Sequence, residues 1–142
     1  MEGCGEVIAA GIIAAIGDIR RFPRDAKLKA YCGVHILPDG RIPRKRLGAV
    51  ANWSGEARQA LYQLGEQFVY RPDSEWGRKL RTYKRALRER HPEVVEVAGK
   101  KRYTDGHIHK MAIWRTLSRF VEWLHREWTR LEAERQDSGH SS

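Results

Sequence analysis

Two glycines one position apart, followed by an apolar run, are the residues best suited to binding chemistry. Gly3 and Gly5 precede segment 6–16, which is rich in alanine and isoleucine. Glycine permits positive φ and close backbone approach, and free amides at a helix N-terminus bind phosphate oxygens. The pattern predicts the hairpin and second helix of a helix–hairpin–helix, a module that grips the nucleic-acid backbone. An ordinary turn before a core helix fits the same spacing.

The charge balance favours a polyanionic partner. The 142-residue chain has 27 Lys and Arg against 18 Asp and Glu, a net charge of +9. Nucleic acid is the first partner this suggests and an anionic membrane the second, although basic surfaces also serve solubility. The expected phosphate-contact residues are Gly3, Gly5, Arg20, Arg21 and Arg24 in a first zone, Arg41, Arg44, Lys45 and Arg46 in a second, and Lys100, Lys101 and Arg102 in a third, with Lys110 as a further candidate.

Catalytic and metal-binding patterns are weak. The acidic residues are scattered, and His107-x-His109 lacks a third ligand at a spacing typical of metal sites. A serine nucleophile needs a base or a strongly positive environment. Ser54 is the weak candidate, since it follows the basic loop, but helix capping already explains it. The residues alone therefore indicate a basic nucleic-acid-binding domain without a self-contained active site and without a cofactor.

The elements that position these residues are mostly helical in the first half of the chain. We expect a buried helix over 6–16, a turn at Gly17-Asp18, and a short helix from Asp25 that ends at Gly33. Residues 34–53 are typical of a loop or short β-ribbon without a core role. Ser54 then caps a helix that ends at Arg71-Pro72.

In the second half, Asp73 is expected to cap a basic helix that ends at His91-Pro92. A small β-ribbon follows over 94–103, and Thr104 or Asp105 caps a long last helix. Residues 136–142 are polar and predict a disordered tail.

The fold class is therefore mainly α, with a helix–hairpin–helix-like N-terminus followed by a small helical bundle, a basic loop and a short β-ribbon. One domain spans residues 1–135, divided into a helix–hairpin–helix part (1–33), a basic loop (34–53) and a helical part (54–135). The two cysteines, Cys4 and Cys32, fit a reducing cytosol, and no run is long enough to span a membrane. The expected location is the cytoplasm of a prokaryote, at the nucleoid.

Several sequence blocks, taken in order, resemble a known family. They are Gly3-x-Gly5 with the Ala/Ile-rich helix, Gly17-Asp18-Ile19-Arg20-Arg21-Phe22-Pro23, Ala30-Tyr31-Cys32-Gly33-Val34, the basic loop, Ala60-Leu61-Tyr62 and His109-Lys110-Met111-Ala112. Over residues 3 to about 130 the chain resembles the C-terminal domain of insertion-sequence transposases of the 110/116/902 group. Because only two residues precede Gly3, we expect a truncated form that lacks the N-terminal domain.

The resemblance implies DNA transposition by a two-part recombinase. In that family an N-terminal RuvC-like domain supplies acidic residues that bind metal, so Mg²⁺ is expected only there. The C-terminal domain supplies a serine nucleophile in a loop where this chain has Asp39-Gly40-Arg41. The implied partners are DNA, an element-encoded guide RNA, and further copies of the chain or a full-length transposase.

Our expectation is DNA binding in transposition and recombination, without catalysis by this chain alone. One alternative is the catalytic half of a serine-type recombinase that a RuvC-like partner completes in trans. A second is a decayed transposase fragment or a general RNA- or DNA-binding module.

Overall fold

The computed structural model describes residues 6–38, 41–44 and 52–140. Within them the chain forms α1 (Glu6–Ile16), the 3₁₀-helix η1 (Ile19–Arg21), α2 (Asp25–Cys32), α3 (Gly55–Tyr70), α4 (Glu75–Arg90), β1 (Val95–Val97), β2 (Lys100–Arg102) and α5 (Asp105–His140). The mainly helical fold class is confirmed, and so is the small β-ribbon. The glycine turn at 3–5 lies outside the described residues.

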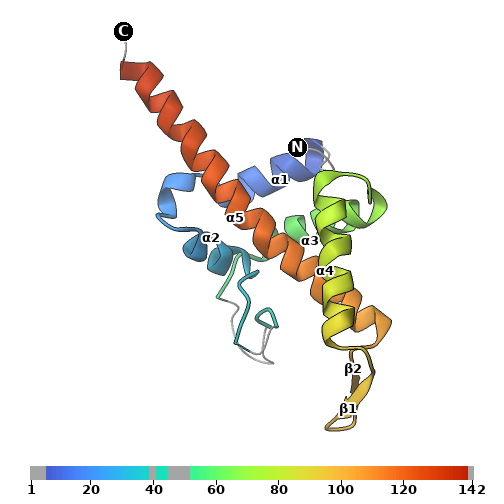
Figure 1. Ribbon diagram of the computed structural model, residues 1–142. Helices are drawn as coiled ribbons and strands as arrows, with labels where there is room; N and C mark the ends of the chain where they lie inside the picture. The colour runs from blue at the N-terminus through green and yellow to red at the C-terminus, as the bar shows by residue number, and fades with distance from the viewer. Residues whose placement is uncertain (1–5, 39–40, 45–51, 141–142) are drawn as a thin grey trace.

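Helix α5 is the axis of the molecule. At 36 residues it is about 54 Å long, and α2, α3 and α4 all pack against it. Helix α1 packs against α3, and the C-terminal end of α5 extends beyond the other elements (Figure 1). The ribbon of β1 and β2 projects at the opposite end, beyond the junction of α4 and α5 (Figure 1).

An aromatic cluster joins α3, α4 and α5. The Trp76 and Phe120 rings meet edge to face at 5.3 Å, and Phe68 lies 5.9 Å from Phe120. All three side chains are buried. Trp76, Leu80 and Leu87 are buried and Tyr83 is partly buried, because helical spacing places these residues on the side of α4 that faces α5.

Two helix starts show how local sequence sets the element boundaries. The Ser54 hydroxyl accepts a hydrogen bond from the Ala57 amide at 3.2 Å, as predicted for an N-cap. The prediction for α4 was wrong: Ser74, not Asp73, is the N-cap, and its hydroxyl accepts from the Gly77 amide at 3.1 Å. Asp73 lies one position too early to reach the first free amides.

Helix α1 is only half buried, which corrects the expectation of a buried helix. Ile12 and Ile16 are enclosed, but Ile13 is 47% exposed. One face of α1 packs on α3, so residues on the opposite face of the helix remain on the surface even when they are apolar.

The segment after α2 was expected to have no core role, and this is wrong for its first residue. Val34 is completely buried. Gly33 ends α2 at φ 68°, and an added Cβ there would lie only 2.7 Å from Cγ of Trp53. The loop thus starts and ends against the core. Its described residues, 34–38, 41–44 and 52–53, contain no strand.

Helix α5 continues through residues 136–140, for which we expected a disordered tail. Arg130 bridges Glu127 and Glu134, and Arg135 pairs with Glu132. Pairs three and four positions apart lie on one helix face and stabilise an exposed helix. They favour helix continuation into the polar end of the chain.

Candidate nucleic-acid interface

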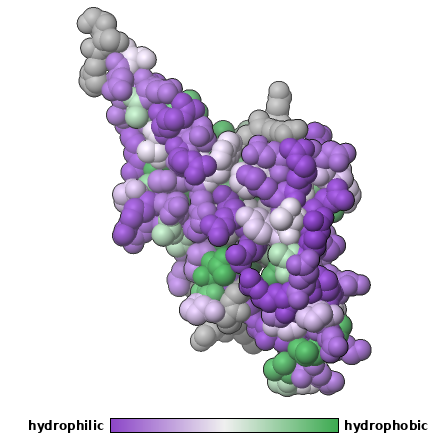
Figure 2. Space-filling model, viewed as in Figure 1, coloured by the Kyte–Doolittle hydropathy of each residue, from purple (hydrophilic) through white to green (hydrophobic). Residues whose placement is uncertain are grey.

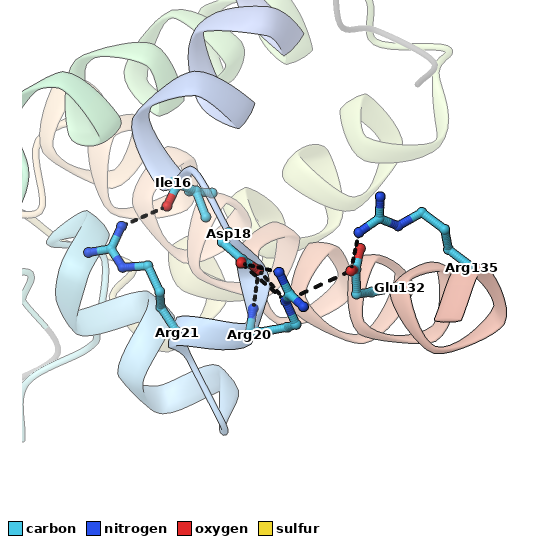
Figure 3. Close-up of polar contacts among 6 residues, drawn as sticks. All are labelled: Ile16, Asp18, Arg20, Arg21, Glu132 and Arg135. Carbon is cyan, nitrogen blue, oxygen red and sulfur yellow. Dashed lines mark hydrogen bonds and ion pairs between the residues drawn. The ribbon is translucent and has the colours of Figure 1, made fainter. Parts of the chain in front are cut away.

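Arg20 of the first predicted zone is paired within the fold. Its guanidinium donates to Asp18, with Nη2 and Oδ2 2.8 Å apart, and its Nε lies 3.8 Å from Oε1 of Glu132 on α5 (Figure 3). The hydrogen bonds from Arg20 hold the pKa of the Asp18 carboxyl below its ordinary value. Arg135 donates to the same Glu132 at 2.6 Å. This network ties η1 to the C-terminal part of α5.

Arg21 closes the end of α1. Its Nη1 donates to the carbonyl oxygen of Ile16 at 2.9 Å (Figure 3). The same guanidinium lies 5.1 Å from the Phe22 ring centre and 5.2 Å from that of Tyr31. A cation at a helix C-terminus satisfies a free carbonyl and complements the helix dipole. Arg24 is exposed at the start of α2, and Gly3 and Gly5 lie outside the described residues.

The second and third zones, in contrast, act on one imidazole through their charges. Burial lowers the pKa of His107, and the positive charges of Arg102, Arg41, Arg44 and His91 lower it further. Arg41 and Arg44 belong to the basic loop, and Arg102 ends β2, some 60 positions later in the chain. We call Arg41, Arg44, Arg102, His91 and His107 the loop–ribbon cluster. Lys45 and Arg46 lie outside the described residues.

The two imidazoles of the loop–ribbon cluster both stack with the Tyr103 ring. The Tyr103 ring lies parallel to that of His91 at 3.9 Å, and the His107 ring lies 5.6 Å away from Tyr103. Nδ1 of His107 accepts a hydrogen bond from the Tyr103 amide at 2.9 Å. In the neutral ring this assigns the proton to Nε2, which is then a donor.

Tyr103 has an unusual backbone. Its φ is +63°, a conformation that few residues other than glycine adopt and that clusters at functional sites. Arg88 of α4 holds it in place, since its Nη1 donates to the Tyr103 carbonyl at 3.0 Å and its Nη2 to Asp105 at 2.7 Å. The base of the ribbon is therefore fastened to α4 and α5.

Arg58 extends the positive surface toward α3. Its guanidinium lies 4.6 Å from the Trp53 ring and 5.2 Å from the Trp114 ring. Burial lowers the pKa of Arg58, and the charge of Arg44 in the basic loop lowers it further. A hollow of about 330 Å³ opens here, lined by Gly55, Arg58, Gln59, Tyr62 and Trp114.

The remaining candidates fall in three places. Lys100 and Lys101 lie on the exposed ribbon, and Lys110 is exposed on α5. Ser54 has an N-capping hydroxyl, and its amide donates to the Tyr31 carbonyl at 2.7 Å.

Sequence reasoning missed His91, Arg58 and Tyr103, and it weighed His107 only as a metal ligand. The cue for His91 and His107 was two imidazoles flanking the basic ribbon.

A second hollow lies between α4 and α5, with a volume of about 540 Å³. Trp76, Tyr83 and Trp123 line it, with cations and two carboxylates around them. Glu122 in this hollow accepts from Lys29 at 2.6 Å and from Arg119 at 3.1 Å. The surface seen in Figure 2 is largely hydrophilic over α4 and α5.

Two negative findings apply to the described part of the chain alone. No group of three or more His, Cys, Asp or Glu side chains there is placed to hold a metal ion. Nor is any of its helices both long and apolar enough to cross a bilayer.

Fold and surface together define a small, basic, mainly helical domain. Residues 1–81 match the family described as Transposase IS116/IS110/IS902. The chain belongs to this transposase family, and its role lies in transposition, which implies an interaction with DNA. No curated protein and no solved structure matched the chain. The family match ends within α4, so the ribbon and α5 lie outside it.

Proposed function

We propose that this chain binds duplex DNA during transposition through phosphate contacts at the loop–ribbon cluster. The observation that carries the proposal is the combined charge of two segments far apart in the sequence. Arg41 and Arg44 of the basic loop and Arg102 of β2 all lower the pKa of His107, whose ring stacks on Tyr103 at the base of the exposed ribbon. Positive charge brought together from two segments attracts an anionic ligand. Arginine forks and an imidazole N–H donor are suited to phosphate oxygens.

Arg58 and the exposed Lys100 and Lys101 widen this surface. Arg44 lowers the pKa values of both Arg58 and His107, so its charge acts both at the hollow of α3 and at the base of the ribbon. A track of cations along two elements matches the regular spacing of charges on a duplex. Contacts of this kind position a protein on DNA without reading its sequence.

Phosphate contacts alone do not distinguish DNA from RNA. The proposal therefore includes a structured RNA as a second ligand for the same cluster. Competition between a labelled DNA duplex and a folded RNA tests this, and simultaneous binding of both without competition would contradict a shared site. The proposal also includes phosphate contacts by Gly3, Gly5 and Arg24 of the first zone, assembly with further copies of the chain, and a location at the nucleoid.

The decisive experiment is a salt titration of duplex binding with two variants of equal charge. Arg44→Gln with Arg102→Gln removes two charges from the cluster. Arg130→Gln with Arg135→Gln removes two charges that pair with carboxylates along α5. Each lost phosphate contact lowers the salt slope by about 0.9, so the first variant loses about 1.8 and the second nothing.

Equal losses in both variants would mean that net charge alone drives binding and would overturn the proposal. A salt-independent affinity of the unaltered chain would do the same.

We also propose that this chain does not cleave DNA by itself. The Ser54 hydroxyl accepts from the Ala57 amide as a helix cap, and the Ser54 amide and carbonyl are hydrogen-bonded to the Tyr31 carbonyl and the Arg58 amide. A capping hydroxyl lacks the adjacent base that activates a serine nucleophile. The test mixes the chain with a full-length relative and looks for a covalent DNA adduct. An adduct that Ser54→Ala abolishes would favour the alternative of a catalytic half completed in trans.

A further inference from the structure

The ribbon of β1 and β2 stands apart from the rest of the fold. Every residue from 92 to 101 is exposed, and the ribbon projects past α4 and α5 (Figure 1). Val95 and Val97 are 42% and 49% exposed. The apolar area at the tip of the ribbon is visible in Figure 2. Exposed apolar side chains on a projecting element indicate a contact surface.

The two faces of the ribbon differ. The antiparallel register pairs Val95 with Arg102 and Val97 with Lys100, so these four side chains share one face. The other face carries the pair of Glu96 and Lys101, which cancel in charge. One face is therefore both apolar and cationic, whereas the other is polar and neutral.

The turn between the strands keeps this arrangement rigid. Ala98 and Gly99 have φ values of 53° and 77°, as in the two-residue turns that match the twist of a hairpin. At the other end, Arg88 fastens Tyr103 and Asp105. The ribbon is thus held at both ends and can present one face to a partner.

We propose that the Val95 and Val97 face enters the major groove of duplex DNA and contacts thymine methyl groups. This inference rests on the proposed function, because the base of the ribbon is part of the loop–ribbon cluster. Arg102 belongs both to that cluster and to the Val95 face. When the loop–ribbon cluster binds a DNA phosphate, the ribbon lies beside the groove that borders this DNA strand.

The dimensions agree with this partner. From Val95 to Ala98 the ribbon extends about 10 Å, and the major groove of B-DNA is about 8.5 Å deep. The groove is about 12 Å wide and admits a two-stranded antiparallel ribbon. Lys100 and Arg102 lie on the same face and complement the charge of the adjacent phosphates. The valine side chains can make apolar contacts with thymine methyl groups in the groove.

The test compares two alternating A·T duplexes of about two helical turns, one with thymine and one with deoxyuridine. They differ in the C5-methyl group alone. Burial of one methyl group contributes about fourfold in affinity, so the unaltered chain is expected to bind the thymine duplex at least about fourfold more tightly. This arm needs no protein variant.

The second arm uses Val95→Thr with Val97→Thr, which keeps β-branching and side-chain size but replaces a methyl with a hydroxyl. Threonine keeps one of the two valine methyl groups, so the preference for thymine is expected to fall from about fourfold to about twofold, with the salt slope unchanged. Val94→Thr is the matched control. Val94 is exposed and lies just before β1, and strand alternation places it on the same face as Glu96, opposite to Val95 and Val97. This variant is expected to retain the preference for thymine.

The outcomes separate the two proposals. Salt-dependent binding of both duplexes with equal affinity overturns the groove contact and leaves the proposed function intact. The same holds if Val95→Thr with Val97→Thr keeps the preference for thymine. If neither duplex is bound in a salt-dependent manner, the proposed function itself fails.

Discussion

Two groups of arginines in this chain have the same chemistry and different surroundings. Arg20 and Arg21 pair with Asp18, Glu132 and the Ile16 carbonyl, so they connect η1 to α5 and close α1. Arg41, Arg44 and Arg102 act on His107 instead: burial lowers the pKa of this imidazole, and their charges lower it further. The first group stabilises the fold and the second raises the local potential. Charge density in the sequence does not distinguish the two roles.

The largest expected effect comes from reversing the loop–ribbon cluster. Arg41→Glu, Arg44→Glu and Arg102→Glu together should weaken duplex binding more than about 100-fold at moderate salt, because contacts become repulsions. Anisotropy titrations on two unrelated sequences measure this, and the loss should be equal on both. A melting temperature that stays within a few degrees would show that the fold is intact. A loss confined to one sequence would point to base readout by these arginines.

Arg21→Ala should have the opposite profile. It removes the hydrogen bond to Ile16 and the contacts with Phe22 and Tyr31, and we expect a loss of about 1–2 kcal/mol in the free energy of unfolding. Urea denaturation measures the loss. The salt slope of DNA binding should not change, and a slope reduced by about 0.9 would place Arg21 on a phosphate instead.

A smaller effect concerns pH and His107. The pKa of His107 is lowered in the DNA-free protein. Below about pH 6.5, the unfolded chain therefore binds a proton at this residue more readily than the folded state does. Stability from this group is therefore present above that pH and is lost as the pH falls. A bound phosphate offsets the charges of Arg102, Arg41, Arg44 and His91, and so it raises the pKa of His107.

Duplex binding should accordingly take up a proton and strengthen a few-fold between pH 8 and pH 6. Calorimetry in buffers of different ionisation enthalpy measures the uptake. His107→Gln should abolish most of it. Uptake that persists in this variant would assign the proton to another group.

The smallest effect belongs to the exposed pair of Asp18 and Arg20. Arg20 lowers the pKa of Asp18, so the pair stabilises the folded state above the ordinary value of 3.8. The destabilisation caused by Arg20→Gln should be small at neutral pH and should vanish as the pH falls through the pKa of folded Asp18. Thermal unfolding at neutral and acidic pH measures this, and an effect that grows in acid would contradict the pairing.

Much of the fold followed from local patterns. Ser54, Gly33 and the helical spacing of Ala57, Leu61 and Leu64 marked α2 and α3 correctly, because capping and periodicity act within a few residues. The error at Asp73 was one position, where two adjacent capping residues competed. The burial of Val34 and the exposure of Ile13 could not be read from sequence, since both depend on which helix lies opposite.

The candidate site was predictable in part. Net charge and the basic loop indicated a polyanionic partner, and the ribbon was expected where it is found. The convergence of Arg44 and Arg102 on His107 was not predictable, because it joins segments about 60 positions apart. The stack of Tyr103 on His91 likewise depends on the positive φ at Tyr103.

The sequence by itself determined the helices, their caps, the ribbon and the excess of positive charge, because these depend on neighbouring residues and on composition. Only the tertiary structure decided which arginines are paired internally and which gather on the surface. That choice depends on the partners that packing brings within a few ångströms. Glu132 reaches Arg20 only because α5 lies across η1, and Arg102 joins the basic loop only because the ribbon begins at the junction of α4 and α5.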